Sequence, residues 1–447
     1  MNRAFARLAF TALFCSLAGA SGQESVSRPQ ELGFPLIQYT LKNGLRVILA
    51  EDDSLPLVSV VVAYGVGPLR EPLGKSGLAY LMENLMFQGS ENVSSMQHVN
   101  YVLRVGGEFN ANTAFDKTYF YETLPSNQLA LGLWLESDRM ASLNVNAANV
   151  EKAKEALSAE HRQRRATEPY LDSFFRFDQM VFPDYAYGHP VMGTEEDLKT
   201  ITEAEVKEFY SAFYVPNNAV LCVSGSLEIS KTKDLIARYF ETIPAGREVA
   251  DPPAPSPDFP SGGRDVLIKD ALVPTPALHA GYHISRIQPA EHYGLKLLDI
   301  IMFRGKSSRL YKRLVKKERI AVYLSGGTEE RRGLAAFKVF VISSNPVTLD
   351  LCRKAIASEI GRLRTSLVPD AELSKAKALF KMDYLNRFST SLQKALFLCE
   401  TRLAGKDPET LPDEYAGYLR VTPMSLIGTV NRIFRPDNEL TLELGTK

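Results

Sequence analysis

Strand-like and helix-like patterns of apolar residues alternate along this chain. Short apolar runs bounded by turn residues predict strands, and apolar residues that recur every three to four positions predict helices. The predicted strands are 45–49, 57–64, 265–269 and 277–282, and the predicted helices include 77–87, 150–165 and 203–213. Strands interleaved with helices in this way predict an α+β fold.

The pattern occurs twice. Residues 213–225, with Pro216 and Asn218, match residues 433–445, with Pro436 and Asn438, at a constant offset of 220 (436 − 216 = 220). Solenoid repeats have periods of roughly 20 to 50 residues, so a repeat of this length indicates a duplicated domain. We predict two homologous domains, each a mostly antiparallel sheet with helices packed on one face.

The predicted domains are separated by a segment in which proline and glycine replace the periodic apolar residues. This segment, 245–264, is expected to be a semi-rigid linker. The predicted domains span 30–244 and 265–447.

The start of the chain has the features of a secretory signal peptide over residues 1–20. Arg3 and Arg7 precede an apolar run that ends in the small residues Ala18-Gly-Ala20. We expect cleavage after Ala20 and a periplasmic or secreted protein. No later run approaches the roughly 20 apolar residues that span a bilayer, so no membrane span is expected.

Composition narrows the classes of function. The 447 residues are 45% hydrophobic and carry a formal net charge of zero, which gives no support to nucleic-acid or anionic-membrane binding. Beyond the predicted signal, Cys222, Cys352 and Cys399 form an odd set that implies no disulfide framework. Cys222 is expected to be a buried free thiol, and a bridge between Cys352 and Cys399 stays open.

Residues 77–89 carry the most informative motif. Tyr80, Glu83 and Asn84 stand at the three positions of a His-x-x-Glu-His zinc helix, in which residues four apart share one face and hold the metal. With its flanks, the stretch 76–90 resembles the zinc helix of the M16 (insulinase, pitrilysin and mitochondrial processing peptidase) family. The resemblance implies that both histidine ligands are replaced, and that Glu83 is a vestigial general base.

Further segments resemble the same family in its order and spacing, so the likeness spans nearly the whole chain. They are 106–121, 133–140, 187–193 and 213–218. The resemblance places the third zinc ligand at Glu160, on a helix similar to 149–165. It also places Ala153 where the family has a supporting glutamate.

The donor chemistry at these positions does not suit zinc. A zinc site relies on imidazole or thiolate ligands, whereas Tyr80 is a phenol with a pKa of about 10 and Asn84 offers a neutral carbonyl. We therefore expect no bound metal and no cofactor, with an oxygen-liganded Ca²⁺ or Mg²⁺ as the alternative. Glu83 is expected to be held by Tyr80, Asn84 or a backbone amide. His161, next to Glu160, is expected to be a solvated surface residue, and no other histidines form a metal cluster by spacing.

Two other segments bear on peptide binding. The family's substrate-holding arginine and tyrosine would fall at Val315 and Val322, so the chain is not expected to supply that pair. The neighbouring cations Arg309, Arg313, Lys316 and Lys317 are expected to form a solvated helix face. The strand residues Asn110, Ala111, Asn112 and Thr113 are predicted to bind an extended peptide through main-chain hydrogen bonds.

The resemblance implies a non-catalytic M16-like subunit that pairs with a zinc-bearing M16 peptidase and helps to form the peptide chamber of a heterodimer. Two alternatives stay open. The chain could be an active metallopeptidase with an unconventional metal site, or a peptide-binding scaffold with no proteolytic role. Whether it is an enzyme is not decided by the residues.

Overall fold

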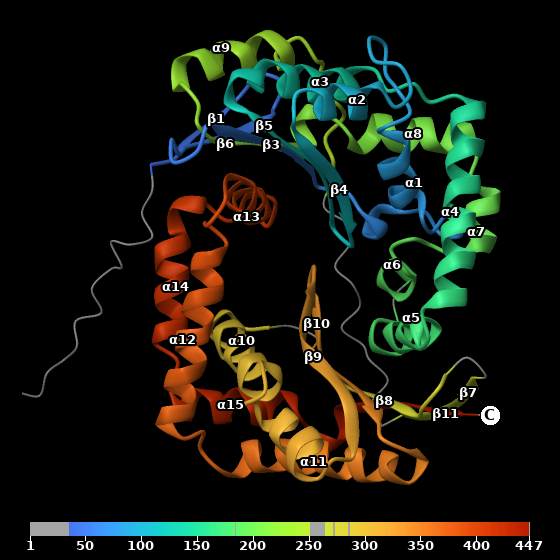
Figure 1. The fold of residues 1–447 in the computed structure, drawn as a ribbon, viewed down its shortest axis with the longest axis vertical. Helices are drawn as coiled ribbons and strands as arrows, with labels where there is room; N and C mark the ends of the chain where they lie inside the picture. Colours follow the sequence, from blue (N-terminus) through green and yellow to red (C-terminus); the bar gives the residue numbers. More distant parts are fainter. Residues whose placement is uncertain (1–34, 184, 251–263, 271–272, 285–286, 447) are drawn as a thin grey trace, which may run out of the picture.

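The computed structural model describes residues 35–183, 185–250, 264–270, 273–284 and 287–446. The predicted signal peptide, and 251–263 of the predicted linker, lie outside the described residues. Within them, two halves built of sheets and helices face each other (Figure 1). The limits of the two domains stay a prediction.

The first half contains a six-stranded sheet in the order β1-β2-β6-β3-β5-β4. Its only parallel neighbours are β2 and β6, so the sheet is mostly antiparallel as predicted. The strands are β1 (Ile37–Thr40), β2 (Arg46–Glu51), β3 (Leu57–Tyr64), β4 (Glu108–Ala114), β5 (Lys117–Pro125) and β6 (Ala219–Gly225).

The second half repeats this topology in a five-stranded sheet of order β7-β11-β8-β10-β9. The pair β7 and β11 is parallel, like β2 and β6, and every other pair is antiparallel. The duplication in the sequence is therefore a duplication of strand order. The strands are β7 (Arg264–Asp270), β8 (Ala277–Ile284), β9 (Ala321–Arg331), β10 (Leu334–Ser343) and β11 (Glu439–Thr446).

The helices of each half pack mainly on one face of its own sheet, and the predicted helices are present within a few residues of their expected ends. The first half holds α1 (Leu78–Leu85), α2 (Gln97–Arg104), α3 (Leu129–Ala141), α4 (Ala147–Thr167), α5 (Leu171–Val181), α6 (Tyr185–Gly188), α7 (Glu195–Thr200), α8 (Glu203–Phe213) and α9 (Ile229–Phe240). The second half holds α10 (Pro289–Phe303), a π-helix over Tyr311–Lys317, α11 (Leu349–Thr365), α12 (Asp370–Asn386), α13 (Ser391–Leu403), α14 (Leu411–Leu419) and α15 (Pro423–Ile433).

Each half also covers part of the other half's sheet with one helix. The helix α13 packs under β3 and β6 of the first sheet, where Ala395, Leu398 and Cys399 meet Val61 and Cys222 (Figure 1). In return, α5 and the residues that follow it pack on β8 and β11 of the second sheet. Both faces of each sheet are thus buried in part, and the two halves share two hydrophobic cores.

We call α13 and α5 the exchanged helices, because each packs on the sheet of the other half. Polar contacts strengthen the packing of both. Lys394 of α13 contacts Asp52 at 2.6 Å, with the lysine side chain almost wholly buried. On the other side, the Arg331 guanidinium lies 2.8 Å from Asp178 of α5 and 3.6 Å from the centre of the Phe115 ring. These contacts help to fix how the halves sit together, because each cation is almost wholly buried and needs a carboxylate partner.

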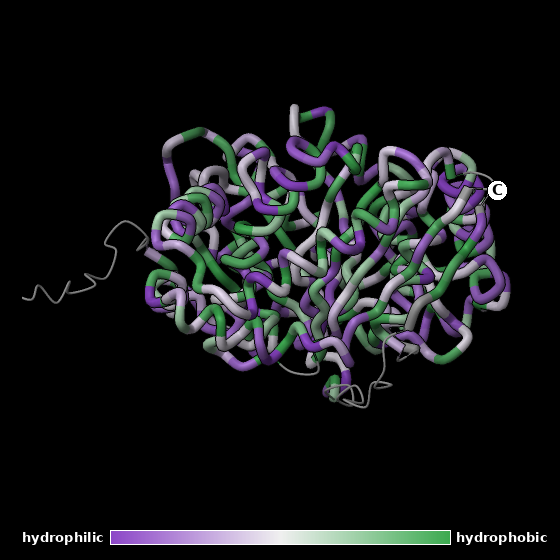
Figure 2. Tube along the Cα trace, turned by 90° about the horizontal axis from the view of Figure 1, so that it is seen from below, coloured by the Kyte–Doolittle hydropathy of each residue, from purple (hydrophilic) through white to green (hydrophobic). Residues whose placement is uncertain are grey.

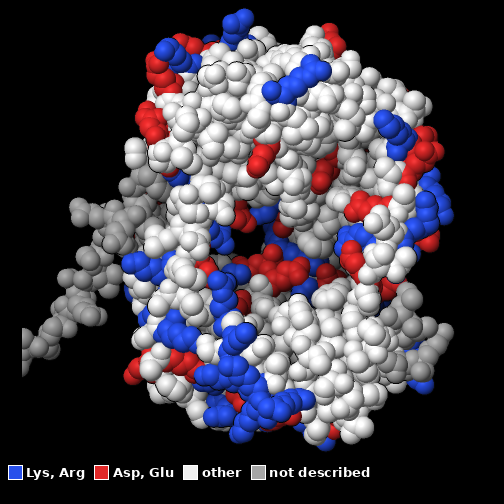
Figure 3. All heavy atoms as spheres, in the orientation of Figure 1, with Lys and Arg blue, Asp and Glu red and all other residues white. Residues whose placement is uncertain are grey.

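Between the halves the molecule is hollowed, and Asp and Glu side chains gather in the hollow (Figure 3). Hydrophobic and hydrophilic residues alternate at short intervals along the trace (Figure 2). In the part of the chain that the structure describes, no helix combines the length and the apolar character required to cross a membrane.

Candidate functional site

The helix α1 carries the motif residues, and a buried carboxylate fixes where it begins. Glu71, on the segment before the helix, accepts hydrogen bonds from the Gly77 and Ala79 amides at 2.9 and 2.7 Å. These amides belong to the first turn, whose N–H groups have no partners within the helix and favour a negative charge. Gly77 has a φ of 90°, and a Cβ there would lie 2.7 Å from the Met192 carbonyl oxygen. Only glycine fits this start.

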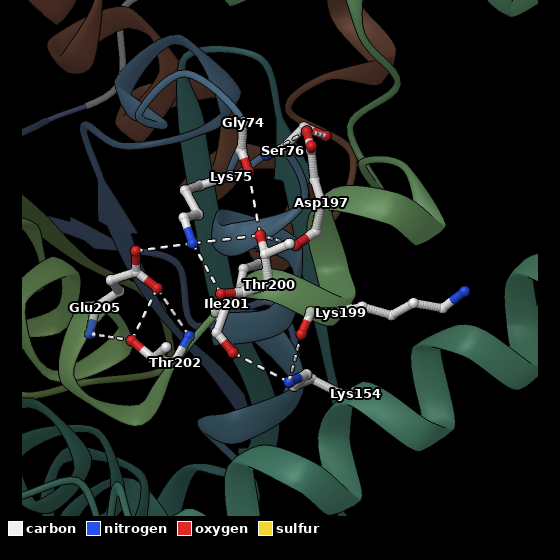
Figure 4. A network of polar contacts seen from close by, with 10 residues as sticks. All are labelled: Gly74, Lys75, Ser76, Lys154, Asp197, Lys199, Thr200, Ile201, Thr202 and Glu205. Atoms are coloured by element: carbon white, nitrogen blue, oxygen red, sulfur yellow. Dashed lines mark hydrogen bonds and ion pairs between the residues drawn. The ribbon is translucent and has the colours of Figure 1, made fainter.

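The residues just before α1 are also tied to α7 and α8 (Figure 4). The Ser76 hydroxyl donates to the Asp197 carboxylate at 2.5 Å, and Lys75 contacts the Thr200 carbonyl oxygen at 2.8 Å and Glu205 at 2.9 Å. The start of α1 is therefore fixed both by Glu71 and by contacts with α7 and α8. This fixes the positions from which the side chains of α1 extend.

Of the three positions implied for metal ligands, Tyr80 of α1 and Glu160 of α4 are in contact, whereas Asn84 is not in contact with Glu160 through any hydrogen bond described here. The Tyr80 hydroxyl donates to Glu160, with distances of 3.1 and 3.3 Å to the two carboxylate oxygens. Asn84 donates from Nδ2 to the Tyr80 carbonyl oxygen at 3.2 Å, so its amide binds its own helix. Burial, and then the Glu160 carboxylate, raise the pKa of Tyr80 above its ordinary value. Tyr80 is therefore a neutral phenol that donates to Glu160.

Glu83 is held from β4 rather than from its own helix. Its Oε2 accepts the Thr113 hydroxyl at 2.5 Å, and the carboxylate also accepts the Thr113 backbone amide. Of the three expected partners, a backbone amide is confirmed, and Tyr80 and Asn84 do not contact it through any hydrogen bond described here. Burial raises the pKa of Glu83, and the bonds from Thr113 oppose this rise.

These residues do not fit zinc. The one carboxylate available as a ligand, Glu160, is occupied by a phenol hydroxyl, and Asn84 faces its own backbone. A zinc site needs imidazole or thiolate donors aimed at one point, and the cluster provides neither. Glu83 has a hydrogen-bonding role here, and no metal-bound water for it to activate is implied by the donors around it.

The strand β4, which carries the expected peptide-binding residues, lies at the edge of the first sheet and pairs only with β5. Asn110 and Asn112 are exposed, Ala111 is half-buried and Thr113 is buried against Glu83. The Asn110 side chain accepts the Ala111 amide at 2.9 Å, so that amide has a partner until a peptide takes its place. An unpaired edge can accept another strand.

Some expected side-chain environments are wrong. His161 is not solvated: it is buried, and its Nε2 lies 3.0 Å from the Met192 carbonyl oxygen, because α4 packs against residues 190–194. The basic residues of 309–317 are only partly a solvated face. Arg309 contacts Glu372 at 2.6 Å and Arg313 contacts Glu359 at 3.1 Å, both across helices that sequence spacing cannot relate.

The segment expected to lack a substrate-holding pair has an exposed end. Val315 packs on the second core from a π-helix, whereas Val322, at the start of β9, is 64% exposed. Tyr323 beside it is 50% exposed. That this chain lacks a substrate-holding arginine and tyrosine stays a prediction.

A fully buried polar cluster in the first half was not predicted from the sequence. Its members are His98 on α2, Glu122 on β5, and Glu136 and Arg139 on α3. Arg139 donates from Nε to Glu136 at 3.0 Å and lies 4.5 Å from the centre of the Phe120 ring. His98 lies 3.8 Å from Glu122. Spacing could not reveal the cluster because its residues come from three elements.

The charges of this cluster favour a bound proton over a bound metal. Ligand atoms of His98, Glu122 and Glu136 lie within 4.8 Å of one another, which is metal-like spacing. Two carboxylates and one guanidinium leave a single negative charge, which one proton neutralises and a divalent cation would reverse. Burial raises the pKa of both Glu122 and Glu136 and lowers the pKa of His98 to about 3. These shifts favour a neutral imidazole and one proton bound by the two carboxyl groups together.

The shared proton makes stability depend on pH. Glu136 has a pKa of about 8 in the folded chain, above the ordinary 4.5, so the folded state binds the proton more tightly than the unfolded state. The stabilisation is complete below about pH 4.5 and is lost as the pH rises towards 8, at up to about 1.4 kcal/mol per pH unit. Urea unfolding should show this decline, and Glu122→Gln, which supplies a permanent neutral donor, should flatten it. An unchanged slope in the folded variant would contradict the shared proton.

Comparisons with known proteins identify the family to which this chain is similar. The family model "Insulinase (Peptidase family M16)" matches residues 46–183, and "Peptidase M16 inactive domain" matches residues 200–380. The zinc protease PqqE of Helicobacter pylori is 28% identical to this chain over 91% of each. An uncharacterized zinc protease of Rickettsia bellii is 22% identical and covers 88% of this chain and 94% of its own.

Solved structures share the fold over nearly the whole chain. A protease from Helicobacter pylori has a TM-score of 0.86 at 25% identity, covering 92% of this chain and 99% of its own. The periplasmic protease PqqL from Escherichia coli has a TM-score of 0.75 at 17% identity, and the match covers 93% of this chain but 48% of that one. With both family models matched in sequence order and the two-domain α+β fold shared, the chain belongs to the M16 (insulinase) family of peptidases.

Proposed function

We propose that this protein is a non-catalytic M16 subunit that pairs with a zinc-bearing M16 peptidase and contributes one wall of the chamber in which peptides are bound. The observation that carries the proposal is the Tyr80 hydroxyl on Glu160. That contact and the inward-turned Asn84 leave the helix α1 intact as a packed element without the donors of a zinc ligand set.

The fold supports pairing. The match to the Escherichia coli protein covers 48% of that chain, so one unit of this size corresponds to about half of a longer relative. Two such units, contributed by separate chains, would make the same kind of four-domain assembly. The Escherichia coli relative is a periplasmic protease, and together with the signal-like start this supports export of our chain to the periplasm, with cleavage after Ala20.

The edge of the first sheet supplies the means of holding a peptide. β4 has one paired side and one free side, and Thr113 at its end is fixed by Glu83. In this proposal Asn110, Ala111, Asn112 and Thr113 bind an extended peptide through their main chain, and Glu83 acts by keeping the strand in place. Glu83 is then a positioning residue.

The proposal is tested by reconstitution with an M16 relative from the same genome that has an intact His-x-x-Glu-His motif. We expect this chain alone to cleave no peptide in a mixed quenched-fluorescent library, and the mixture to cleave at least about 10-fold faster than the relative alone. Gel filtration should show the two chains eluting together.

Two matched variants identify which subunit carries out the reaction. Replacing the motif glutamate of the relative with glutamine should abolish cleavage by the mixture, whereas Glu83→Gln in this chain should reduce it only in part. Cleavage by this chain alone that is lost on chelation and with Glu83→Gln would overturn the proposal in favour of a metallopeptidase with an unconventional site. Peptide binding with no effect on the relative would favour a scaffold.

A further inference from the structure

Two cysteines meet at the contact between the halves. Cys222 lies on β6 of the first sheet and Cys399 lies on the exchanged helix α13, and both are fully buried in the same hydrophobic cluster. They come from opposite halves of the chain, 177 residues apart (399 − 222 = 177).

The helix approaches the sheet closely because both surfaces carry small side chains. On α13, Ser391, Ala395 and Cys399 are spaced four apart and so lie on one face. This face meets Ala63 and Cys222 in the shared core, and the Ser391 hydroxyl lies 2.8 Å from the Ser59 hydroxyl on β3. A hydroxyl pair at that distance requires the two backbones to be near each other, since each serine side chain is short.

Cys222 lies close enough to Cys399 to add to the effect of burial in raising the pKa of the Cys399 thiol. The Cys399 sulfur also lies 3.9 Å from the Val220 carbonyl oxygen, on the strand that carries Cys222. The other cysteine of the described chain, Cys352, lies in a different core and donates to the Ile320 carbonyl oxygen at 3.3 Å. The bridge between Cys352 and Cys399 that the sequence left open is therefore wrong, and a single pairing is specified.

We propose that Cys222 and Cys399 form a disulfide that joins the first sheet to the exchanged helix when the chain folds in the presence of a disulfide oxidant. One thiolate attacks the oxidant's disulfide and expels a thiolate. The second cysteine then displaces the remaining oxidant thiol from the mixed disulfide. Two protein thiols lose two electrons and two protons, and the oxidant is reduced to two thiols. The inference does not depend on the proposed function.

Burial determines when the bond forms. It raises the pKa of the Cys399 thiol, and only the thiolate attacks a disulfide. Once the core has closed, the Cys399 thiol is protonated and both sulfur atoms are shielded from solvent. The bond therefore forms while α13 is docking, and reduction of the finished protein should require unfolding or a strong reductant.

The test is refolding from denaturant in a buffer of oxidised and reduced glutathione, followed by alkylation, proteolysis without reduction and mass spectrometry. We expect a cross-linked peptide pair that contains Cys222 and Cys399, with Cys352 alkylated. The oxidised chain should also unfold at a temperature at least about 4 °C above the same chain refolded in reductant.

Matched variants separate the pair from the rest of the chain. Cys352→Ala should leave the cross-link and the temperature difference in place, whereas Cys222→Ala should abolish both. If Cys222→Ala fails to fold, the oxidised and reduced forms of the unmodified protein still give the comparison. Alkylation of both Cys222 and Cys399 in the folded, oxidant-treated protein, or a cross-link to Cys352, would overturn the inference.

Discussion

The variant carrying Tyr80→His and Asn84→His is expected to bind one zinc ion per chain, more tightly than the unmodified protein by over about 100-fold. Replacement of residues that merely support a zinc ligand changes affinity by about 10- to 100-fold, so restoring two ligands should exceed that. The helix frame is retained by Glu71, and Glu160 already contacts position 80. Competition with a fluorescent zinc chelator measures the affinity.

Three further variants show whether the ion binds at the intended place. Either single histidine variant should bind far more weakly than the double variant, because each supplies one imidazole. Adding Glu160→Gln to the double variant should remove most of the gain, since a neutral amide replaces the carboxylate ligand. A double variant that folds normally and binds no zinc would show that the pocket differs from a zinc site in more than its ligands.

Arg139→Leu is expected to lower the free energy of unfolding by about 3–5 kcal/mol. The Arg139 guanidinium is the only cation paired with Glu136 among the described contacts, and both side chains are almost completely buried. Removal of one partner leaves an uncompensated charge in the interior, and that is what makes such changes costly. Urea unfolding followed by circular dichroism measures the change.

A matched arginine and a double variant test the cause. Arg104→Leu, at the exposed end of α2, should change the free energy by less than about 0.5 kcal/mol. The pair Arg139→Leu and Glu136→Gln should regain part of the loss, because the orphan charge is gone. If the double variant regains none of the stability lost in Arg139→Leu, the loss comes from the packing of the guanidinium against Phe120 and not from an orphan charge on Glu136.

Much of the fold was open to prediction because its signals are local or repeated. The strand expected at 57–64 and the helix expected at 203–213 have the bounds of β3 and α8. The repeat at an offset of 220 predicted two homologous domains, and the two sheets do share a strand order. The exchange of α5 and α13 was not predictable. The apolar faces of these helices predict that they are buried, but an amphipathic pattern does not indicate which sheet a helix packs against.

At the site, the sequence predicted which positions come together but not what holds them. The family motif implies that positions 80 and 160 lie near one another, and the Tyr80 hydroxyl lies 3.1 Å from Glu160. The bond from Thr113 to Glu83 and the burial of His161 depend on how β4 and residues 190–194 approach their helices. Such contacts between distant segments are set by packing, and spacing along one element carries no information about them.

The exchanged helix α13 has a consequence for the order in which the protein can be made. One face of the first sheet is covered by α13, residues 391–403, which is among the last parts of the chain to be synthesised. Until they emerge, β3 and β6 present an apolar surface that chaperones recognise and that favours aggregation. The first half therefore cannot complete its folding during translation, and this delay suits the proposed export, in which a chain stays unfolded until it has crossed a membrane.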